Sequence, residues 1–355
     1  MILFKNKGDW HLFPGVIKKG TGTYFLYLWK KVTVPYFGPF YLTGFGFGSK
    51  LFSSCPDVST FIHFFTGRSY MKTISFVEVR DNIKYIVQEA NFVLQDDVVK
   101  VVEDMKEREE SPVAKAVFDQ MLQNAQIAKS EKLGLCQDTG LAIFFVEIGE
   151  DVSLKKDGDM GSLREAIEEG VRAGYEEGYL RKSVVSDPIR RKNTGDNTPA
   201  YIHWELVPGD VFKVTFIAKG GGAENMSQIR MFAPAAGQEG IENFVVETVE
   251  KGSSNPCPPT VVGVGVGGNF EYSALLAKKA LLRRPLGSHN ADPFYKDMEI
   301  RLLERVNNLG IGPQGLGGRV TSLAVHVEAF PCHIASMPAA VNIQCHSHRV
   351  MSFEM

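Results

Sequence analysis

Three cysteines lie in polar, glycine-rich or proline-rich segments that suit loops, and their thiolates could bind metal. Cys136 lies in Leu-Cys-Gln-Asp-Thr-Gly, Cys257 in Asn-Pro-Cys-Pro-Pro, and Cys345 in Asn-Ile-Gln-Cys-His. They are spread over more than half of the chain, whereas zinc knuckles and ferredoxins bring their ligands in closely spaced groups. The spacing therefore indicates one site that the fold assembles, with an incomplete thiolate shell. An iron–sulfur cluster with one iron left open fits such a shell.

The alternative is three unrelated thiols, because a free cysteine behaves as a small hydrophobic residue. The surroundings of Cys136 and Cys257 weaken this alternative, since both lie among polar, Gly or Pro residues and not in apolar stripes. An open iron can act as a Lewis acid on a hydroxyl or carboxylate oxygen of a substrate. Cys55 and Cys332 are left outside this predicted cluster.

Two further segments carry groups that could hold a substrate. Gln137 and Asp138 directly follow Cys136, and an amide and a carboxylate there can orient a substrate hydroxyl or the metal ligand. An Asp that only caps the backbone near Gly140 is an equally good reading. Residues 219–225 read Lys-Gly-Gly-Gly-Ala-Glu-Asn. Their glycines favour a ligand loop, with N–H groups turned toward an anion, over a flexible turn.

Single basic residues could bind substrate carboxylates. Arg181 follows the end of a predicted helix, and its guanidinium can grip a carboxylate in a two-pronged manner. His333 precedes Cys345 by twelve residues and could donate to a carboxylate if the fold brings it near the metal, although a lone His is more often structural.

Residues 263–268 match the pattern G-x-G-x-x-G, which occurs in dinucleotide sites. The acidic residue expected roughly 20 positions further on is missing, and we recognise no βαβ unit around the segment. The sequence therefore does not predict an NAD site. We expect these glycines to bring a helix N-terminus near an anionic ligand.

These loops need helices and strands to position them. Helical periodicity fills residues 71 to about 132 and returns at 163–179. Asp292 followed by Pro293 predicts a helix start, and Gly310 a stop. Strand patterns occur at 141–148, 201–206, 211–218, 260–266 and 320–330. We expect an α/β (α+β) fold with mixed β-sheets flanked by helices, a helical N-terminal part after Met71, and a cluster held by loops.

Composition narrows the class of protein. The 355 residues are 44% hydrophobic and 23% charged, with a formal net charge of −2, which argues against a nucleic-acid or membrane-surface binder. Five cysteines do not make a disulfide scaffold, and an odd count fits a reducing compartment, so we expect a cytoplasmic protein. No segment has the pattern of a transmembrane helix or a signal peptide.

The chain divides into two parts of unlike composition. Residues 1–70 are rich in Phe, Tyr and Gly, have only Asp9 and Asp57 as acidic residues, and show no clear helical or strand period. We expect this part to be a spurious or disordered N-terminal extension; the alternative is a small aromatic-rich β module. Residues 71–355 would form the catalytic domain.

Six motifs, taken together and in this order, resemble the α subunit of the two-subunit, iron–sulfur class I fumarate hydratases. The related L-tartrate dehydratase α subunit shares the pattern, and the resemblance covers about Met71 to Arg349. The motifs are Leu-Cys-Gln-Asp-Thr-Gly at 135–140, Leu-Arg-Lys-Ser at 180–183, Asn-Thr-Gly-Asp-Asn-Thr-Pro at 193–199, Lys-Gly-Gly-Gly-Ala-Glu-Asn at 219–225, Gly-Pro-Gln-Gly-Leu-Gly-Gly at 312–318 and His-Ile-Ala-Ser-Met-Pro at 333–338.

The resemblance implies a hydro-lyase that interconverts fumarate and (S)-malate. It implies a [4Fe–4S] cluster held by three cysteines, which would be Cys136, Cys257 and Cys345. The catalytic residues would be Gln137, Asp138 and His333, and the substrate-binding residues Arg181, Gly220, Ala223 and Asn225. Single-chain members continue into a second domain that supplies further carboxylate-binding and proton-transfer groups. We therefore expect an obligate β subunit and an α2β2-type assembly, with no nucleic acid or membrane partner.

Some positions depart from the family pattern, and two other functions stay open. Residues 1–70 have no recognised counterpart, and Cys332 stands where a small residue such as Ala or Thr is expected. L-Tartrate dehydratase would use the same site on a different diol. A more distant alternative is a non-enzymatic protein stabilised by zinc, with Cys332, Cys345, His346 and His348 as ligands. This alternative leaves Cys136 and Cys257 unexplained.

Overall fold

A computed structural model describes residues 3–6, 9–12, 16–19, 22–25 and 71–355, and the chain divides into two units, Met1–Arg68 and Ser69–Met355. In the first unit two antiparallel pairs form: β1 (Leu3–Asn6) with β2 (Asp9–Leu12), and β3 (Val16–Lys19) with β4 (Gly22–Phe25). These hairpins correct the sequence reading, which found no strand period there. The expectation of a spurious or disordered extension falls mostly on residues outside the described ones and stays a prediction.

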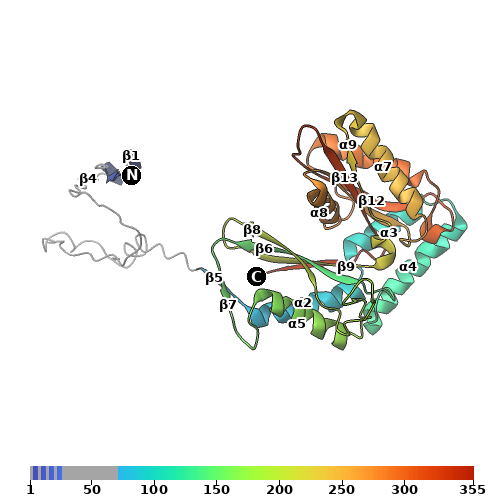
Figure 1. The fold of residues 1–355 in the computed structure, drawn as a ribbon, viewed down its shortest axis with the longest axis horizontal. Coiled ribbons are helices and arrows are strands. Elements are labelled where there is room, and N and C mark those ends of the chain that lie inside the picture. The colour runs from blue at the N-terminus through green and yellow to red at the C-terminus, as the bar shows by residue number, and fades with distance from the viewer. Residues whose placement is uncertain (1–2, 7–8, 13–15, 20–21, 26–70) are drawn as a thin grey trace. The chain divides into compact units, whose positions relative to one another are not determined.

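The first sheet of the second unit has the strand order β14–β9–β6–β8 (Figure 1). Its strands are β6 (Leu141–Gly149), β8 (Tyr201–Val207), β9 (Phe212–Lys219) and β14 (Val350–Glu354). Strand β6 is parallel to β8 and antiparallel to β9, and β14 is antiparallel to β9. The sheet is therefore mixed, as the sequence predicts.

Helices α2 (Phe76–Phe92) and α5 (Leu163–Glu177) pack on this sheet. The Ser75 hydroxyl caps α2 by accepting from the Glu78 N–H at 3.2 Å, as an N-cap serine does. A Cβ atom at Gly170 of α5 would lie 2.6 Å from the Arg80 carbonyl oxygen, so only glycine allows the two helices to approach so closely. Beside them β5 (Lys72–Ser75) pairs in parallel with β7 (Val152–Lys155).

The second sheet has the order β10–β13–β11–β12. Its strands are β10 (Gln228–Phe232), β11 (Thr260–Gly267), β12 (Ser322–Phe330) and β13 (Met337–Gln344). Strands β11 and β12 are parallel, and α8 (Phe270–Ala280) and α9 (Pro293–Asn307) connect them. This connection is a βαβ unit, which the sequence reading did not recognise. The predicted helix start is confirmed, because Asp292 caps α9 and Pro293 opens it.

The glycines at 263–268 have a packing role. Cβ atoms at Gly263 and Gly265 would each lie 2.1 Å from a backbone carbonyl oxygen of α8, at Ala277 and Ser273 respectively. Helix α8 therefore rests directly on the β11 backbone. The N-terminus of α8 follows the Gly267 end of β11, whereas Cys257 precedes the other end. The α8 N-terminus is therefore at the end of β11 away from Cys257, and the expectation that these glycines bring it near an anionic ligand stays a prediction.

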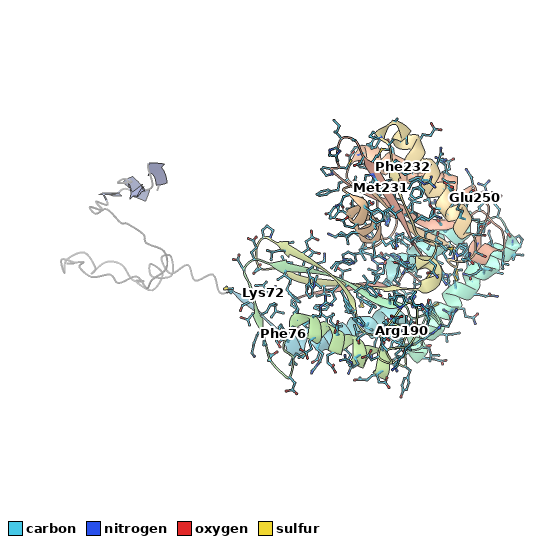
Figure 2. All side chains as sticks on the ribbon, viewed as in Figure 1. Lys72, Phe76, Arg190, Met231, Phe232 and Glu250 are labelled. Atoms are coloured by element: carbon cyan, nitrogen blue, oxygen red, sulfur yellow. The ribbon has the colours of Figure 1, made fainter. Side chains whose placement is uncertain are left out.

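Three longer helices and three short ones complete the described part of the second unit. Helix α7 (Gly237–Gly252) packs with α9 on the second sheet. On the edge strand β10 Met231 is exposed, and the Phe232 ring contacts the Phe244 ring of α7 edge-on. Figure 2 labels the two β10 residues. Helices α3 (Asp96–Arg108) and α4 (Pro112–Glu131) share one core with residues of both sheets. Short helices lie at α6 (Gly221–Glu224), η1 (Pro234–Ala236) and η2 (Pro313–Gly315).

The predicted fold class is confirmed, with helices on mixed sheets and a helical part after Met71. In the part of the chain that the structure describes, no helix has the length and apolar character needed to cross a membrane.

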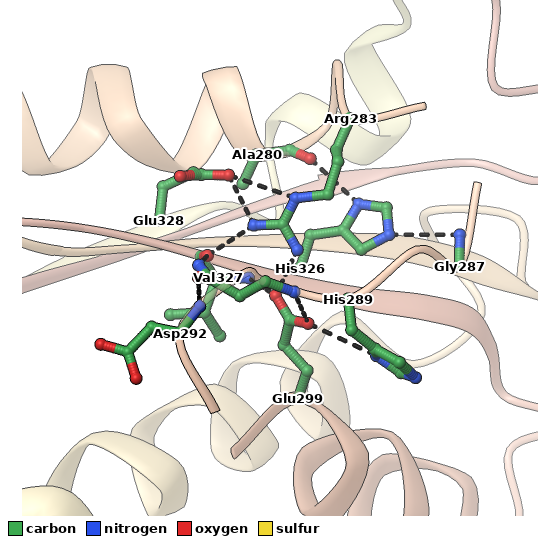
Figure 3. Close-up of polar contacts among 10 residues, drawn as sticks. Ala280, Arg283, Gly287, His289, Asp292, Glu299, His326, Val327 and Glu328 are labelled. Atoms are coloured by element: carbon green, nitrogen blue, oxygen red, sulfur yellow. Dashed lines mark hydrogen bonds and ion pairs between the residues drawn. The ribbon is translucent and has the colours of Figure 1, made fainter. Parts of the chain in front are cut away.

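A buried ion network holds the α8–α9 connection on β12 (Figure 3). The Arg283 guanidinium forms ion pairs with Glu299 and Glu328 and donates to the Val327 carbonyl oxygen at 2.7 Å. Glu299 is 1% exposed and also accepts from the Val327 N–H at 2.7 Å. Nearby, burial lowers the pKa of His326 to about 4, so its ring is neutral near pH 7 and its Nε2 can accept from the Gly287 N–H at 3.2 Å. Every charge in this network has a partner.

Candidate active site

The first cysteine loop connects α4 to β6 and is fixed from both sides. Helix α4 ends at Lys132, which has a left-handed backbone. The Leu135 N–H donates to the Asn91 carbonyl oxygen at 2.8 Å, and the Asn124 side chain donates to the Leu135 carbonyl oxygen at 3.0 Å. Cys136 follows directly and is partly buried. Two helices therefore set the backbone from which this thiol projects.

Asp138 links the first cysteine loop to the triple-glycine loop. Its Oδ1 accepts from the Gly140 N–H at 3.0 Å and its Oδ2 from the Gly221 N–H at 2.7 Å. A Cβ atom at Gly220 would lie 3.2 Å from Asp138 Oδ2, which is tighter than side chains ordinarily allow. The capping role of this aspartate is therefore confirmed, and its carboxylate also accepts a hydrogen bond from a second loop. Its role toward a substrate stays a prediction.

Gly140 brings the two strands that carry these loops together. Its φ is +76°, and a Cβ atom there would lie 2.7 Å from the Lys219 backbone. Its carbonyl oxygen accepts from the Tyr175 hydroxyl at 3.1 Å and the Asn197 side chain at 3.2 Å. Both side chains are fully buried, and burial raises the pKa of Tyr175 well above its usual range, so its hydroxyl stays a donor.

Arg181 is anchored to the first cysteine loop through its backbone. The Thr139 hydroxyl donates to the Arg181 carbonyl oxygen at 2.9 Å, while the Arg181 side chain is exposed. Two residues further on, the Ser183 N–H donates to Asn197 Oδ1 at 2.7 Å. The structure therefore brings the Leu-Arg-Lys-Ser and Asn-Thr-Gly-Asp-Asn-Thr-Pro motifs beside Cys136.

The second cysteine loop precedes β11 and contacts the other two loops. Cys257 has a left-handed backbone, with φ +54°, and its carbonyl oxygen accepts from the His346 N–H at 3.4 Å. The Gln314 side chain donates to the Pro258 carbonyl oxygen at 3.1 Å. A Cβ atom at Gly222 would lie 2.9 Å from the Asn255 carbonyl oxygen. The triple-glycine loop therefore lies between the Cys136 and Cys257 loops.

The third cysteine, Cys345, is buried and lies between β13 and β14. Its segment is tied to the end of β9 by two bonds. Lys219 Nζ donates to the Ile343 carbonyl oxygen at 2.6 Å, and Gln344 Nε2 donates to the Ala218 carbonyl oxygen at 2.9 Å. Sequence analysis treated Lys219 only as the start of the glycine motif and did not place it at the site.

Lys219 and Glu224 form a buried ion pair beside Cys345. Lys219 is 0% exposed, and burial lowers its pKa to about 8. Its Nζ lies 3.1 Å from Glu224 Oε2, and Lys278 Nζ lies 2.6 Å from Glu224 Oε1. Burial opposes the charge of Glu224, but the two lysines and their hydrogen bonds lower its pKa to about 2. The pair is therefore charged near pH 7.

The three thiols lie within electrostatic reach of one another. Burial raises the pKa of Cys136 and of Cys257, and the charge of Cys345 raises both further. Within residues 71–355, no group of three or more His, Cys, Asp and Glu side chains is arranged to hold a single metal ion. An iron–sulfur cluster makes a different demand, because its sulfides bridge the irons and each thiolate binds a separate iron. Three converging thiols on separate loops fit that donor set.

The other predicted site residues differ in how close they lie to the cysteines. Gln137 is exposed and its Oε1 faces Cys136 Sγ at 3.4 Å. Ala223 is buried and Asn225 exposed, both at the short helix α6. His333 precedes β13, whereas Cys345 follows it. The eight residues of this strand span about 27 Å at ~3.4 Å each. The structure therefore does not bring His333 to the cysteines.

A hollow of about 860 Å³ lies elsewhere, between the first sheet and α8. His203, Trp204, Tyr272 and Lys279 are among its lining residues, and it includes none of the predicted site residues. We therefore place the candidate active site at the cysteine loops.

Comparison with known proteins gives a consistent result. A model of the family described as fumarate hydratase (Fumerase) matches residues 80–354. The putative L(+)-tartrate dehydratase subunit alpha of Methanocaldococcus jannaschii is 39% identical over 77% of this chain and 96% of its own length. The L(+)-tartrate dehydratase subunits alpha of Escherichia coli and Shigella sonnei are 35% and 34% identical, over 72% of this chain and 84% of their own lengths.

Proposed function

The chain belongs to the fumarate hydratase (Fumerase) family and is a hydro-lyase, and from that premise we propose that it is the catalytic α subunit of an iron–sulfur fumarate hydratase. It would interconvert fumarate and (S)-malate. The observation that carries this proposal is the convergence of the Cys136, Cys257 and Cys345 loops around Asp138 and the triple-glycine loop.

We assign the three cysteines as ligands of a [4Fe–4S] cluster. When bound, such a cluster supplies an open iron that polarises the carbon–oxygen bond as a Lewis acid. The Asp138 carboxylate, held by the Gly140 and Gly221 N–H groups, would accept a hydrogen bond from the substrate hydroxyl or the attacking water in a fixed direction. Gln137 would offer its amide beside it.

Basic and backbone groups would orient the substrate carboxylates. Arg181 combines a fixed backbone with an exposed guanidinium, which suits two-pronged carboxylate binding. Gly220 brings its backbone close to Asp138, and Ala223 and Asn225 extend the same loop. Such positioning converts binding energy into orientation. His333 is not part of this proposed site, because it lies at the other end of β13.

A β subunit would complete the site in an α2β2-type assembly. The curated relatives described above are named as alpha subunits, which supports a partner chain. A base that could remove the carbon-bound proton is not evident among the described site residues. Asp138 accepts from two backbone N–H groups, and Lys219 is paired with Glu224. We assign the proton-transfer group to the partner.

L-Tartrate dehydratase, which would convert tartrate to oxaloacetate, is the second candidate. The names of relatives 34–39% identical to this chain favour it. Both reactions remove water from a dicarboxylate that carries a hydroxyl beside a carboxylate, so the same iron and Asp138 would serve either. The two candidates differ in whether a second hydroxyl must be bound.

The test is anaerobic co-purification with the partner chain, followed by cluster reconstitution. We expect about four irons and four sulfides per chain, and a higher kcat/KM for fumarate and (S)-malate than for L-tartrate. A preference for tartrate would replace the first candidate by the second. Absence of bound iron and sulfide after reconstitution would overturn both, and full activity without the partner would overturn the subunit assignment.

A further inference from the structure

Arg349 is a buried arginine beside the cysteine loops that sequence analysis did not assign. It lies between Cys345 and β14, and it is 1% exposed. Its Nη1 donates to the Asp138 carbonyl oxygen at 2.8 Å and to Asn91 Oδ1 at 3.0 Å. Its Nε and Nη2 are also buried and have no partner among the described residues.

The charge of Arg349 is therefore not neutralised by a side chain in the part of the chain that the structure describes. Its polar partners there are two neutral oxygens. A guanidinium keeps its charge at any ordinary pH, and a buried charge without a counter-charge is costly. Arg283, by contrast, is paired with two carboxylates. Arg349 forms no ion pair with any carboxylate of the described residues; the nearest one, Asp138, is bonded instead to the Gly140 and Gly221 N–H groups.

The unpartnered atoms lie on the site side of this arginine. A Cβ atom at Gly220 would lie 3.7 Å from Arg349 Nη2 and 3.2 Å from Asp138 Oδ2. Of the eight buried side-chain atoms without a partner in the described residues, six belong to residues 342–349, which surround Cys345. His348, one of these, has its pKa lowered by burial to about 3, so it adds no charge near pH 7.

We propose that Arg349 supplies the buried counter-charge for an anionic cluster bound by Cys136, Cys257 and Cys345, and that it thereby controls cluster retention and reduction potential. This inference rests on the proposed function. Three thiolates make the bound cluster net negative, and net charge and hydrogen bonds to it set its potential. Arg349 is a positioning residue, since it acts on the reaction through the cluster and through the backbone of Asp138.

The test compares Arg349→Gln, which is neutral, with Arg349→Lys, which keeps the charge. Iron release to a chelator and the reduction midpoint are measured anaerobically on the reconstituted complex. We expect Arg349→Gln to release iron about 10- to 100-fold faster, the range typical of groups that support metal ligands, and to have a more negative midpoint. Arg349→Lys should restore most of both. Arg349→Met is a second neutral variant for which the same result is expected.

Arg283→Gln is the control, because it removes a partly buried guanidinium at the α8–α9 connection and not at the cysteine loops. It should lower the melting temperatures of the cluster-free and the loaded protein alike, and leave iron release and the midpoint unchanged. The inference is overturned if the neutral variants keep the wild-type release rate and midpoint, or if Arg349→Lys behaves like Arg349→Gln. If wild-type protein takes up no iron and sulfide, the proposed function has failed instead.

Discussion

Two arginines in the second unit, Arg283 (partly buried) and Arg349 (buried), have opposite surroundings. Arg283 lies at the α8–α9 connection and is surrounded by Glu299, Glu328 and a backbone carbonyl (Figure 3). Arg349 lies beside the cysteine loops and, among the described residues, donates to two neutral oxygens and to no carboxylate. The more exposed arginine, 14% against 1%, is thus fully paired, whereas the more deeply buried one is left with unused donors.

The difference distinguishes an arginine that stabilises the fold from one that could bind a ligand. A complete ion network fixes a loop on a strand and has nothing left to offer a ligand. A buried cation with spare N–H groups destabilises the protein until an anion arrives. The unpaired polar atoms around Cys345 are therefore consistent with the active site proposed there.

Loss of one cysteine ligand should have the largest effect. Cys257→Ser is expected to reduce fumarate hydration about a thousandfold or more, since a Lewis-acid metal contributes several kcal/mol to such a reaction. The measurement is kcat/KM together with iron and sulfide content. Cys332→Ser, which changes an exposed thiol outside the site, should keep both. Equal losses of activity and of iron in Cys257→Ser and Cys332→Ser would contradict the assignment of Cys257 as a cluster ligand.

Removing a carboxylate partner of Arg283 should mainly lower the stability of the fold. Glu299→Gln is expected to lower the free energy of unfolding by about 3 kcal/mol, because it uncouples a buried charge pair. Urea unfolding of the cluster-free protein measures this. Glu328→Gln serves as the control: its side chain is 36% exposed against 1% for Glu299, so the loss should be smaller. Reversal of that order would contradict the role assigned to burial.

A methyl group at Gly220 tests the tight contact between the two site loops. Gly220→Ala is expected to reduce kcat/KM about 10- to 100-fold, because the added Cβ atom would displace Asp138 and small misplacements cost catalysis dearly. Gly161→Ala is the control, since its nearest neighbour is the movable end of the Glu165 side chain. Wild-type kcat/KM in Gly220→Ala would remove Asp138 from the proposed mechanism.

The smallest expected effect is a pH dependence of the unfolding free energy. It arises from the ion pair of Lys219 and Glu224 beside Cys345. The folded-state pKa of Glu224 is lowered from 4.5 to about 2, so its stabilising contribution is complete above pH 4.5 and is lost as pH falls toward 2. The difference in unfolding free energy between wild type and Glu224→Gln should therefore narrow below pH 4.5. A constant difference down to pH 3 would show that the charge of Glu224 does not matter.

Much of the fold follows from periodicity and capping. Strand β6 is predicted at 141–148 and found at Leu141–Gly149, and the predicted start of α9 at Pro293 is confirmed. Strand β13 is not predicted because its buried residues mix with Pro, Asn and Gln and form no pure apolar run. Strand β14 is not predicted because its five residues, Val-Met-Ser-Phe-Glu, are too few to show a clear period. The βαβ unit at β11 was missed because the contact of its glycines with α8 is not visible in a local pattern.

The site could be predicted in part. Residue type and loop context single out Cys136, Cys257 and Cys345, and those loops do converge. The role of His333 is implied only by the family resemblance, and strand β13 separates it from Cys345. Arg349 could not be found from sequence, because nothing local tells a buried unpaired arginine from a surface one.

The three cysteines come from connections far apart in the chain, and this has a consequence for how the protein matures. A cofactor bound to all of them would close two loops of roughly a hundred residues each, and closing such loops removes freedom from the unfolded chain. Each of the three predicted ligands comes from a different connection, so a partly folded chain would bind the cofactor poorly. Cofactor insertion would then act as a checkpoint, completed only by chains in which both sheets have already formed.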